Sequence, residues 1–369
     1  MGGLAQPEDL FLHFGPPPLT LTHIVVAKNV RNRAGAQTVR ACPPDEPPDN
    51  CARRRRTPWG PLSTSCPGRV EQVQSEQADR AEPQVIGVIG DLVDDVVVRL
   101  GGPINLASDT TSVIRRRRGG SGANVAAAVV AAGGAARFIG QVGDDQGGHA
   151  LVAALQQAGV ETNVRTRGRT GTVVVLVAEN GERTMLTDRG ACADLTDPDP
   201  SWLDGLAALH VPLYSLITEP MATTAATLVG WAHDRGLFVT VDASSVGAIE
   251  EHGVGATSEL IRAQAADVLF CNADEAATLE PVGPLEGLAA SVIVKRGAGV
   301  ATLLRTHTDA AMVAAEQIAD VHDTTGAGDA FAAGYLVALL HGDDSVGALT
   351  NAHRAAAAAI RVASAQTSA

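Results

Sequence analysis

A loop of small residues with an aspartate near its end is the part of the chain best suited to chemistry. It reads DTTGAGDAF from Asp323 to Phe331, and an apolar helix is predicted to follow over Ala330 to Leu340. The glycines allow a tight turn whose N–H groups point at one spot. The start of a helix adds unpaired donors and a positive dipole end. Such a place binds phosphate.

Asp329, the acid in this loop, would repel a bound phosphate, so its presence there indicates a chemical role. A carboxylate here suits a general base that takes a proton from a hydroxyl about to attack phosphorus. The alternative is an ordinary acid in the first turn of a helix, which helices favour. The loop thus indicates phosphoryl transfer, with Asp329 as the base and the amides of Gly326, Ala327 and Gly328 as an anion hole.

Size and composition suit helices packed closely on a sheet. The chain has 369 residues, is 45% hydrophobic but 3% aromatic, and carries a formal net charge of -13. That charge argues against a nucleic-acid partner. There is neither an apolar run long enough to span a membrane nor a signal-peptide pattern, so we expect a cytoplasmic protein with no membrane partner. The cysteines form neither a CxxC pair nor an even-numbered framework, which predicts reduced thiols.

Residues 1–80 differ from the rest of the chain. Prolines cluster at 16–18, 43–44 and 47–48, arginines run from Arg53 to Arg56, and no helical or strand period is sustained. We expect this extension to be disordered. A targeting tail and a mis-assigned translation start both account for it. Residues 81–369 would form the folded domain.

From Val85 onward, strand-like and helix-like segments alternate, which predicts an α/β fold with a mostly parallel sheet covered on both faces. A hairpin signal breaks the alternation. Thr172–Ala178 and Arg183–Thr187 flank an Asn-Gly pair, the strongest short hairpin signal. Segments at about 96–118 and 168–190 are therefore predicted to form a small second sheet. It would serve as a lid over an acceptor site or as an edge for another subunit, and an idle surface hairpin is the alternative.

A second motif lies near the start of the folded region. It reads GGSGANVA from Gly119 to Ala126 and continues to GQVGDDQG from Gly140 to Gly147. It lacks the Lys-Ser/Thr pair of a P-loop. Together with the loop that ends in Asp329, it resembles the paired motifs of the ribokinase-like (PfkB) carbohydrate kinase family. The resemblance covers roughly Val85 to the C-terminus.

The resemblance implies a three-layer ribokinase-like fold with a small β lid. It also implies ATP-dependent phosphorylation of a hydroxymethyl group on a small sugar, with Mg²⁺ as cofactor. A homodimer through the lid is a further expectation from the family. The positions that match the family's sugar site are Asp95, with Asp94 as its rival if the loop is shifted by one, and Gly119, Gly120, Asn124 and Tyr214.

The nucleotide side is matched more weakly. Asn272 would contact phosphate and Glu275 would order Mg²⁺ through water, and the alternative is an N-cap beside a surface glutamate. Lys295 and Gly297 stand where the family contacts the nucleotide. His353 also falls at a nucleotide-side position, although a packing histidine is the alternative.

Ribokinase-type members hold a monovalent cation beside the anion hole. Asp323 and Thr325 match two of its ligand positions, and Ala359, Val362 and Ser364 would supply backbone oxygens from a loop. The glycine position of that loop is Ser364 here, so a need for K⁺ stays open.

Four arginines, Arg115 to Arg118, immediately precede the GGSGANVA motif, which we call the sugar-loop motif because it matches the family's sugar site. They alternate between the faces of a strand, so they cannot all reach one ligand. We expect solvated side chains. The alternative is that one of them favours an anionic or phosphorylated acceptor.

The acceptor itself stays open. The same fold and loop serve nucleoside kinases, and a deoxy-keto-sugar acid is another candidate. A catalytically silent, nucleotide-binding regulatory protein is the alternative from another class. The presence of both Asp329 and its glycine-rich loop favours an enzyme.

Overall fold

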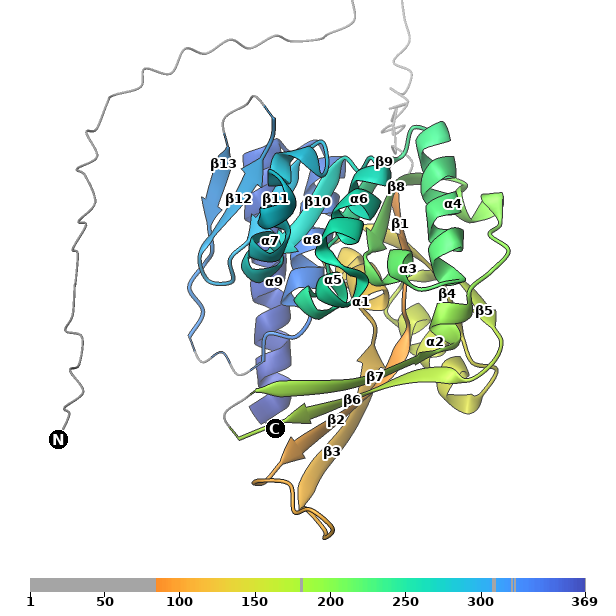
Figure 1. Ribbon diagram of the computed structural model, residues 1–369, viewed down its shortest axis with the longest axis vertical. Coiled ribbons are helices and arrows are strands. Elements are labelled where there is room, and N and C mark those ends of the chain that lie inside the picture. The colour runs from red at the N-terminus through yellow and green to blue at the C-terminus, as the bar shows by residue number, and fades with distance from the viewer. Residues whose placement is uncertain (1–83, 180–181, 307–309, 320, 322, 369) are drawn as a thin grey trace, which may run out of the picture. The chain divides into compact units, whose positions relative to one another are not determined.

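The structure is a computed structural model that describes residues 84–179, 182–306, 310–319, 321 and 323–368. The expected extension over residues 1–80, and the hairpin residues Asn180 and Gly181, lie outside the described residues. In the described part, a large sheet carries helices on both faces, and a small sheet lies below it in the view of Figure 1.

The large sheet accounts for most of the strands. Its strands lie in the order β13 (Ala311–Ala314), β12 (Val300–Leu304), β11 (Val292–Lys295), β10 (Val268–Asn272), β9 (Phe238–Asp242), β8 (Leu206–Pro212), β1 (Val85–Ile89), β4 (Ala135–Val142) and β5 (Glu161–Thr166).

Most neighbours in this sheet are parallel, as the sequence predicted. All pairs from β11 across to β5 are parallel, while β12 and β13 add an antiparallel edge. The central strands are short apolar runs because helices cover them on both sides. In such a sheet, residues at the carboxyl ends of the strands meet at one edge, where ligands bind in open α/β folds.

Helices form the two outer layers. One face of the sheet packs against α4 (Met221–Asp234), α5 (Val246–His252), α6 (Val254–Ala263) and α7 (Ala273–Leu279), which lie in front in Figure 1. The other face packs against α1 (Ser121–Ala131), α2 (Gln146–Gln157), α8 (Ala327–Leu340) and α9 (Ser345–Ser368). A short helix, α3 (Tyr214–Ile217), follows β8.

Helix α8 is buried on nearly all sides, because it lies between the sheet and α9. A Cβ atom added at Gly334 would lie 2.6 Å from the Cβ of Ala355 and 2.8 Å from the carbonyl of Asn351, both on α9. Small residues thus let the two helices pack closely. This packing accounts for an alanine-rich composition with few aromatic residues.

The small sheet has the strand order β3 (Ser112–Gly119), β2 (Val93–Leu100), β6 (Thr170–Val177) and β7 (Arg183–Gly190). Strands β2 and β3 are antiparallel, β2 and β6 are parallel, and β6 and β7 are antiparallel. These strands come from the two segments for which the sequence predicted a separate sheet. β2 begins shortly after β1 ends, so the two sheets share a continuous stretch of chain.

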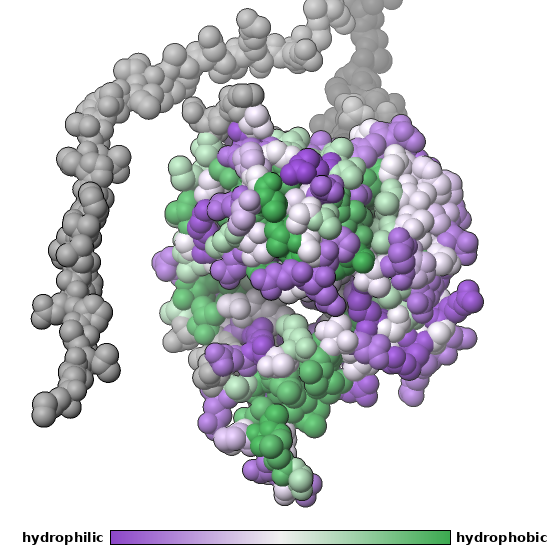
Figure 2. Space-filling view, viewed as in Figure 1, coloured by the Kyte–Doolittle hydropathy of each residue, from purple (hydrophilic) through white to green (hydrophobic). Residues whose placement is uncertain are grey.

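The two faces of the small sheet have different surroundings. One face, with Asp95 and Val175, lines a cavity. The opposite face carries exposed apolar side chains, with Ile114 at 62% and Leu186 at 55% exposure, together with the charged pair of Asp94 and Arg116. Figure 2 shows a broad hydrophobic area over this sheet and a hollow between it and the rest of the molecule.

The structure differs from the sequence expectation mainly at helix ends and at the edges of the large sheet. Helix α8 begins at Ala327 rather than Ala330, so Asp329 lies inside its first turn. The edge strands β5 and β13 were not predicted, and neither of them has a buried residue. Of the helices described, none combines the length and apolarity that a membrane span requires.

Candidate active site

A cavity of about 680 Å³ lies where the carboxyl ends of the parallel strands face the small sheet. Its wall includes residues from the ends of β9, β10 and β11, from the first turns of α1 and α8, and from the strands of the small sheet. The sequence-predicted residues found in this wall are Asp95, Gly120, Asn124, Tyr214, Asn272, Glu275, Lys295, Gly297, Thr325, Gly326, Ala327, Gly328, Asp329 and His353.

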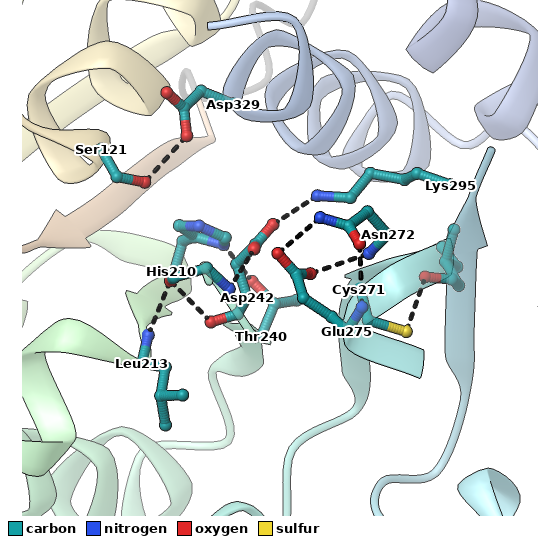
Figure 3. Close-up of polar contacts among 12 residues, drawn as sticks. Ser121, His210, Leu213, Thr240, Asp242, Cys271, Asn272, Glu275, Lys295 and Asp329 are labelled. Atoms are coloured by element: carbon teal, nitrogen blue, oxygen red, sulfur yellow. Dashed lines mark hydrogen bonds and ion pairs between the residues drawn. The ribbon is translucent and has the colours of Figure 1, made fainter. Parts of the chain in front are cut away.

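Asp329 is held at the junction of the two sequence motifs. The hydroxyl of Ser121, in the first turn of α1, donates to its Oδ1 at 2.8 Å (Figure 3). Burial raises the pKa of Asp329 to about 6, and the charge of Asp242 adds to this effect, against the hydrogen bonds from Ser121 and Asn124. A carboxylate with this pKa is ionised at neutral pH and still basic enough to take a proton.

The loop before Asp329 leads into the helix through a left-handed glycine. Gly326 has φ 76° and occupies the N-cap position of α8, so no N-cap side chain covers the first amides. The N–H of Ala327 donates to the carbonyl of Thr324 at 3.1 Å. Of the three amides expected to form an anion hole, that of Ala327 therefore already has a partner in this conformation.

A buried lysine faces this helix start. A Cβ atom added at Gly328 would lie 3.5 Å from the Nζ of Lys295. The same Nζ lies 2.7 Å from an Asp242 carboxylate oxygen, and the two side chains are 12% and 10% exposed. Figure 3 shows Lys295 reaching from the end of β11 to Asp242 at the end of β9. Burial opposes the charge of Lys295, but attraction to Asp242 holds its pKa above the ordinary value.

Asp242 was not among the residues singled out from the sequence. It also lines the cavity. A usable signal existed, because Asp242 is the only acid in the apolar run Phe238–Asp242 and ends a predicted parallel strand. The carboxyl ends of such strands are where ligand-binding residues gather.

Asn272 and Glu275 form a capping box at the start of α7. The Asn272 side chain accepts from the Glu275 amide at 2.9 Å, and Glu275 accepts from the Asn272 amide at 2.8 Å. The predicted N-cap is therefore present, but Glu275 is buried and lines the cavity rather than the surface. Burial, followed by repulsion from Asp242, raises the pKa of Glu275 to about 7.

Asp95, rather than Asp94, faces the cavity. Asp94 lies on the opposite face of β2 and pairs with Arg116. A Cβ atom added at Gly119 would lie 2.0 Å from Asp95 Oδ1, so the glycine makes room for this carboxylate. Burial raises the pKa of Asp95, although the nearby Arg117 acts against this.

A second acid on the same side, Asp91, was missed by the sequence reasoning. It lies two residues after the end of β1 and lines the cavity. The guanidinium of Arg189 donates to both of its oxygens, at 2.8 and 2.7 Å. The Gly90-Asp91 pair after the first strand was a signal for a site residue, but Arg189, the partner of Asp91, is distant in the sequence.

The expectation that Arg115–Arg118 are solvated is wrong for two of the four. Arg117 lines the cavity and lies 3.6 Å from Asp95, with 35% of its side chain exposed. Arg118 has a buried Nη1 without a hydrogen-bond partner. Burial lowers the pKa of Arg118. Arg116 is 70% exposed, as expected.

Tyr214 and His353 are distant in the sequence but lie in the wall of the same cavity. Tyr214 begins α3, and burial raises its pKa. The Nε2 of His353 lies 3.0 Å from the carbonyl of Val313, and its ring packs edge-on against Phe331 with centroids 5.1 Å apart. His353 is therefore a packed residue that also borders the cavity, which combines both sequence interpretations.

The residues expected to bind a monovalent cation do not form such a site. Ala359, Val362 and Ser364 lie inside helix α9, not in a loop. Carbonyl groups in the interior of a helix accept hydrogen bonds from amides four residues further on. Asp323 and Thr325 lie beside the anion loop, but both contact Arg183 on β7. The expected oxygen cage is thus contradicted by the secondary structure and by the partner already present.

Similarity to known proteins agrees with this architecture. The chain shares 33% identity over 234 residues with a fructokinase of Klebsiella pneumoniae, covering 58% of this chain and 74% of the relative. Matches to fructokinases span from 33% to 74% of the relatives' own length.

Among solved structures, adenosine kinase from Sinorhizobium meliloti superposes with a TM-score of 0.68 at 24% identity, covering 78% of this chain and 100% of that one. Arabidopsis thaliana ribokinase complexed with ribose and ATP superposes with a TM-score of 0.63 at 21% identity, covering 76% and 93%. These likenesses show a ribokinase-like fold. The model of the pfkB family of carbohydrate kinases matches residues 86–369, and the chain belongs to that family.

Proposed function

We propose that this protein transfers the γ-phosphoryl group of ATP to a hydroxymethyl group of a small sugar. The observation that supports this most directly is the position of Asp329. Its carboxylate is bonded by Ser121 of the sugar-loop motif, lies in the first turn of α8, and borders the same cavity as Asp95 and Lys295. One carboxylate thus stands between a hydroxyl-binding side and a phosphate-binding side.

The nucleotide side is suited to phosphate. The uncapped start of α8 offers backbone donors and a positive dipole end. Lys295 adds a buried positive charge close to Gly328. Charge that develops on the transferred phosphoryl oxygens would be stabilised by these groups.

The donor set on this side also fits Mg²⁺. Asp242 and Glu275 bring two carboxylates into one wall of the cavity. The pKa of Glu275 is raised mainly by burial and secondly by repulsion from Asp242. Among the described residues, no group of three or more His, Cys, Asp or Glu side chains could cage a metal. Mg²⁺ does not need such a cage, since it commonly takes one or two carboxylates together with substrate phosphates and water. When bound, it would neutralise phosphate charge.

The acceptor side offers hydrogen-bonding groups for hydroxyls. Asp95 would accept from two neighbouring hydroxyls, and Asn124 offers a donor and an acceptor. Both line the cavity. Asp329 takes the proton of the attacking hydroxyl as that oxygen approaches the γ-phosphorus. Because several relatives are named fructokinases, a ketohexose is the first acceptor to test.

The small sheet would act as a lid over the acceptor. Its cavity-facing side contributes Val173, Val175 and Met185, which are apolar and would exclude water from the reacting hydroxyl. Water excluded in this way cannot compete as acceptor. The expected homodimer through this sheet stays a prediction.

A nucleoside is the second candidate acceptor, because the Tyr214 side chain lies in the cavity wall and could stack on a base. Coupled ADP release, measured over ketohexoses, aldohexoses, pentoses, keto-acids and nucleosides, tests the proposal and ranks these acceptors. Rapid turnover with a sugar would support it. ADP release that no acceptor increases would refute it, and the absence of any ADP release would favour a silent nucleotide-binding protein.

A further inference from the structure

The acidic residue that precedes the anion loop is bound by an arginine from the small sheet. Arg183 Nη2 lies 2.6 Å from Asp323 Oδ1, and Arg183 Nη1 donates to the hydroxyl of Thr325. Arg117 Nη1 lies 3.7 Å from the other oxygen of Asp323. The side chains of Arg183 and Asp323 are 24% and 13% exposed, so the contact is mostly shielded from water.

This contact also shapes the turn that leads into α8. The amide of Thr325 donates to Asp323 Oδ1 at 2.7 Å, and the amide of Asp323 lies 3.3 Å from the Ser364 hydroxyl. One carboxylate oxygen therefore joins the turn to Arg183. Through the turn, β7 is fastened to the residues immediately before Gly326 and Asp329. In Figure 1, β7 begins beside the C-terminal part of α9, which carries Ser364.

The same two side chains, Asp323 and Thr325, are those expected to bind a monovalent cation. A cation there would need water for its further oxygen ligands, because Ala359 and Val362 lie within α9. A guanidinium needs only acceptors placed for its planar fork, and a carboxylate oxygen beside a hydroxyl supplies them. Arg183 thus occupies both acceptors, and a bare cation can reach them only when Arg183 is removed.

We propose that the guanidinium of Arg183 takes the place of the monovalent cation in this protein. The proposal rests on the proposed function, because its purpose is to order the anion loop for phosphoryl transfer. Arg183 neutralises Asp323, whose charge would otherwise repel phosphate near the start of α8. It also holds the Asp323–Thr325 turn, and so acts as a positioning residue through that turn.

A tethered charge has two consequences that a free ion lacks. The guanidinium of Arg183 is attached to the chain and stays protonated at every working pH, so its charge is present whatever cation the solution contains. The charge also belongs to the small sheet, so the anion loop is fully ordered only while β7 lies against it. Order in the loop and closure of the small sheet are thereby linked in one contact.

The test is the effect of K⁺ on the wild-type enzyme and on Arg183→Met. Turnover of the wild type should be the same in potassium chloride and in tetramethylammonium chloride. Arg183→Met should lose at least about tenfold in kcat in tetramethylammonium chloride, which is less than the about 10²–10³-fold cost of removing an anion-hole donor because Arg183 acts through the turn. Added K⁺, or guanidinium below denaturing concentration, should recover most of that loss, and Arg183→Lys should keep part of the activity.

Arg116→Met is the matched control, because Arg116 lies on β3, at the opposite edge of the small sheet from β7, and pairs with Asp94 on its outer face. It should behave as the wild type in both salts. Several-fold stimulation of the wild type by K⁺ would overturn the proposal. So would normal turnover of Arg183→Met, or a loss that neither K⁺ nor guanidinium repairs, which would place Arg183 directly on a ligand.

A readout without turnover separates this proposal from the proposed function. Potassium chloride, compared with tetramethylammonium chloride, should raise the melting temperature of Arg183→Met and leave that of the wild type unchanged. If no acceptor is phosphorylated but this difference is seen, the proposal that Arg183 takes the place of the cation stands and the kinase proposal fails. Equal changes in the melting temperatures of both proteins would refute the proposal that Arg183 takes the place of the cation.

Discussion

Replacing Asp329 by asparagine should remove most turnover and make the protein more stable at neutral pH. The side chain keeps its shape and can still accept from Ser121, but it loses its charge. A general base contributes about 10²–10⁴-fold to the rate, so kcat should fall within that range. Stability should rise because the charged carboxylate is costly where it lies.

The size of the stability change follows from the pKa. Burial raises the pKa of Asp329 from 3.8 to about 6. The folded state therefore binds the proton more tightly than the unfolded state does. Stability from this group is complete below about pH 4 and is lost as the pH rises through about 6. A difference of about two pKa units corresponds to about 3 kcal/mol, which we take as the upper bound for the gain in Asp329→Asn.

Urea unfolding at about pH 7.5 and about pH 4.5 measures the gain, and coupled ADP release measures turnover. The variant should exceed the wild type in unfolding free energy at the higher pH, and the difference should shrink at the lower pH. Asp144→Asn is the control, since Asp144 is 71% exposed and should affect neither measurement. A variant that is less stable at the higher pH, or that turns over within tenfold of the wild type, would refute the reasoning.

Three further outcomes are expected. Lys295→Met should lower the free energy of unfolding by about 3 kcal/mol, because it leaves Asp242 charged and unpaired, and adding Asp242→Asn should restore stability but not turnover. Unchanged stability in the single variant would contradict this pairing. Asp95→Asn should raise the KM for the acceptor by at least about tenfold and leave the KM for ATP unchanged in initial-rate measurements, since charge-assisted bonds to hydroxyls are lost. Equal changes in both KM values would argue against its role. The logarithm of kcat/KM should fall with unit slope below about pH 6 as Asp329 becomes protonated, and a flat profile down to about pH 5 would exclude this carboxylate as the base.

The sequence alone determined the features that depend on neighbouring residues. Alternating apolar segments specified the parallel sheet and its helices, because each period reports which face is buried. The loop before Asp329 and the loop at Gly119 could be recognised because glycine-rich turns at helix starts have local requirements. The Asn-Gly pair marked the separate hairpin region for the same reason, since turn geometry is set by the residues in the turn.

Tertiary structure decided the contacts between segments that are distant along the chain. Asp242 meets Lys295 because the carboxyl ends of β9 and β11 open at one edge of the sheet. Asp91 is held by Arg189, and Asp323 by Arg183, because the small sheet lies across that edge. No local pattern records such pairings. The expected cation loop failed for the same reason, since whether a carbonyl is available depends on whether its segment continues as a helix and on which side chain arrives from elsewhere.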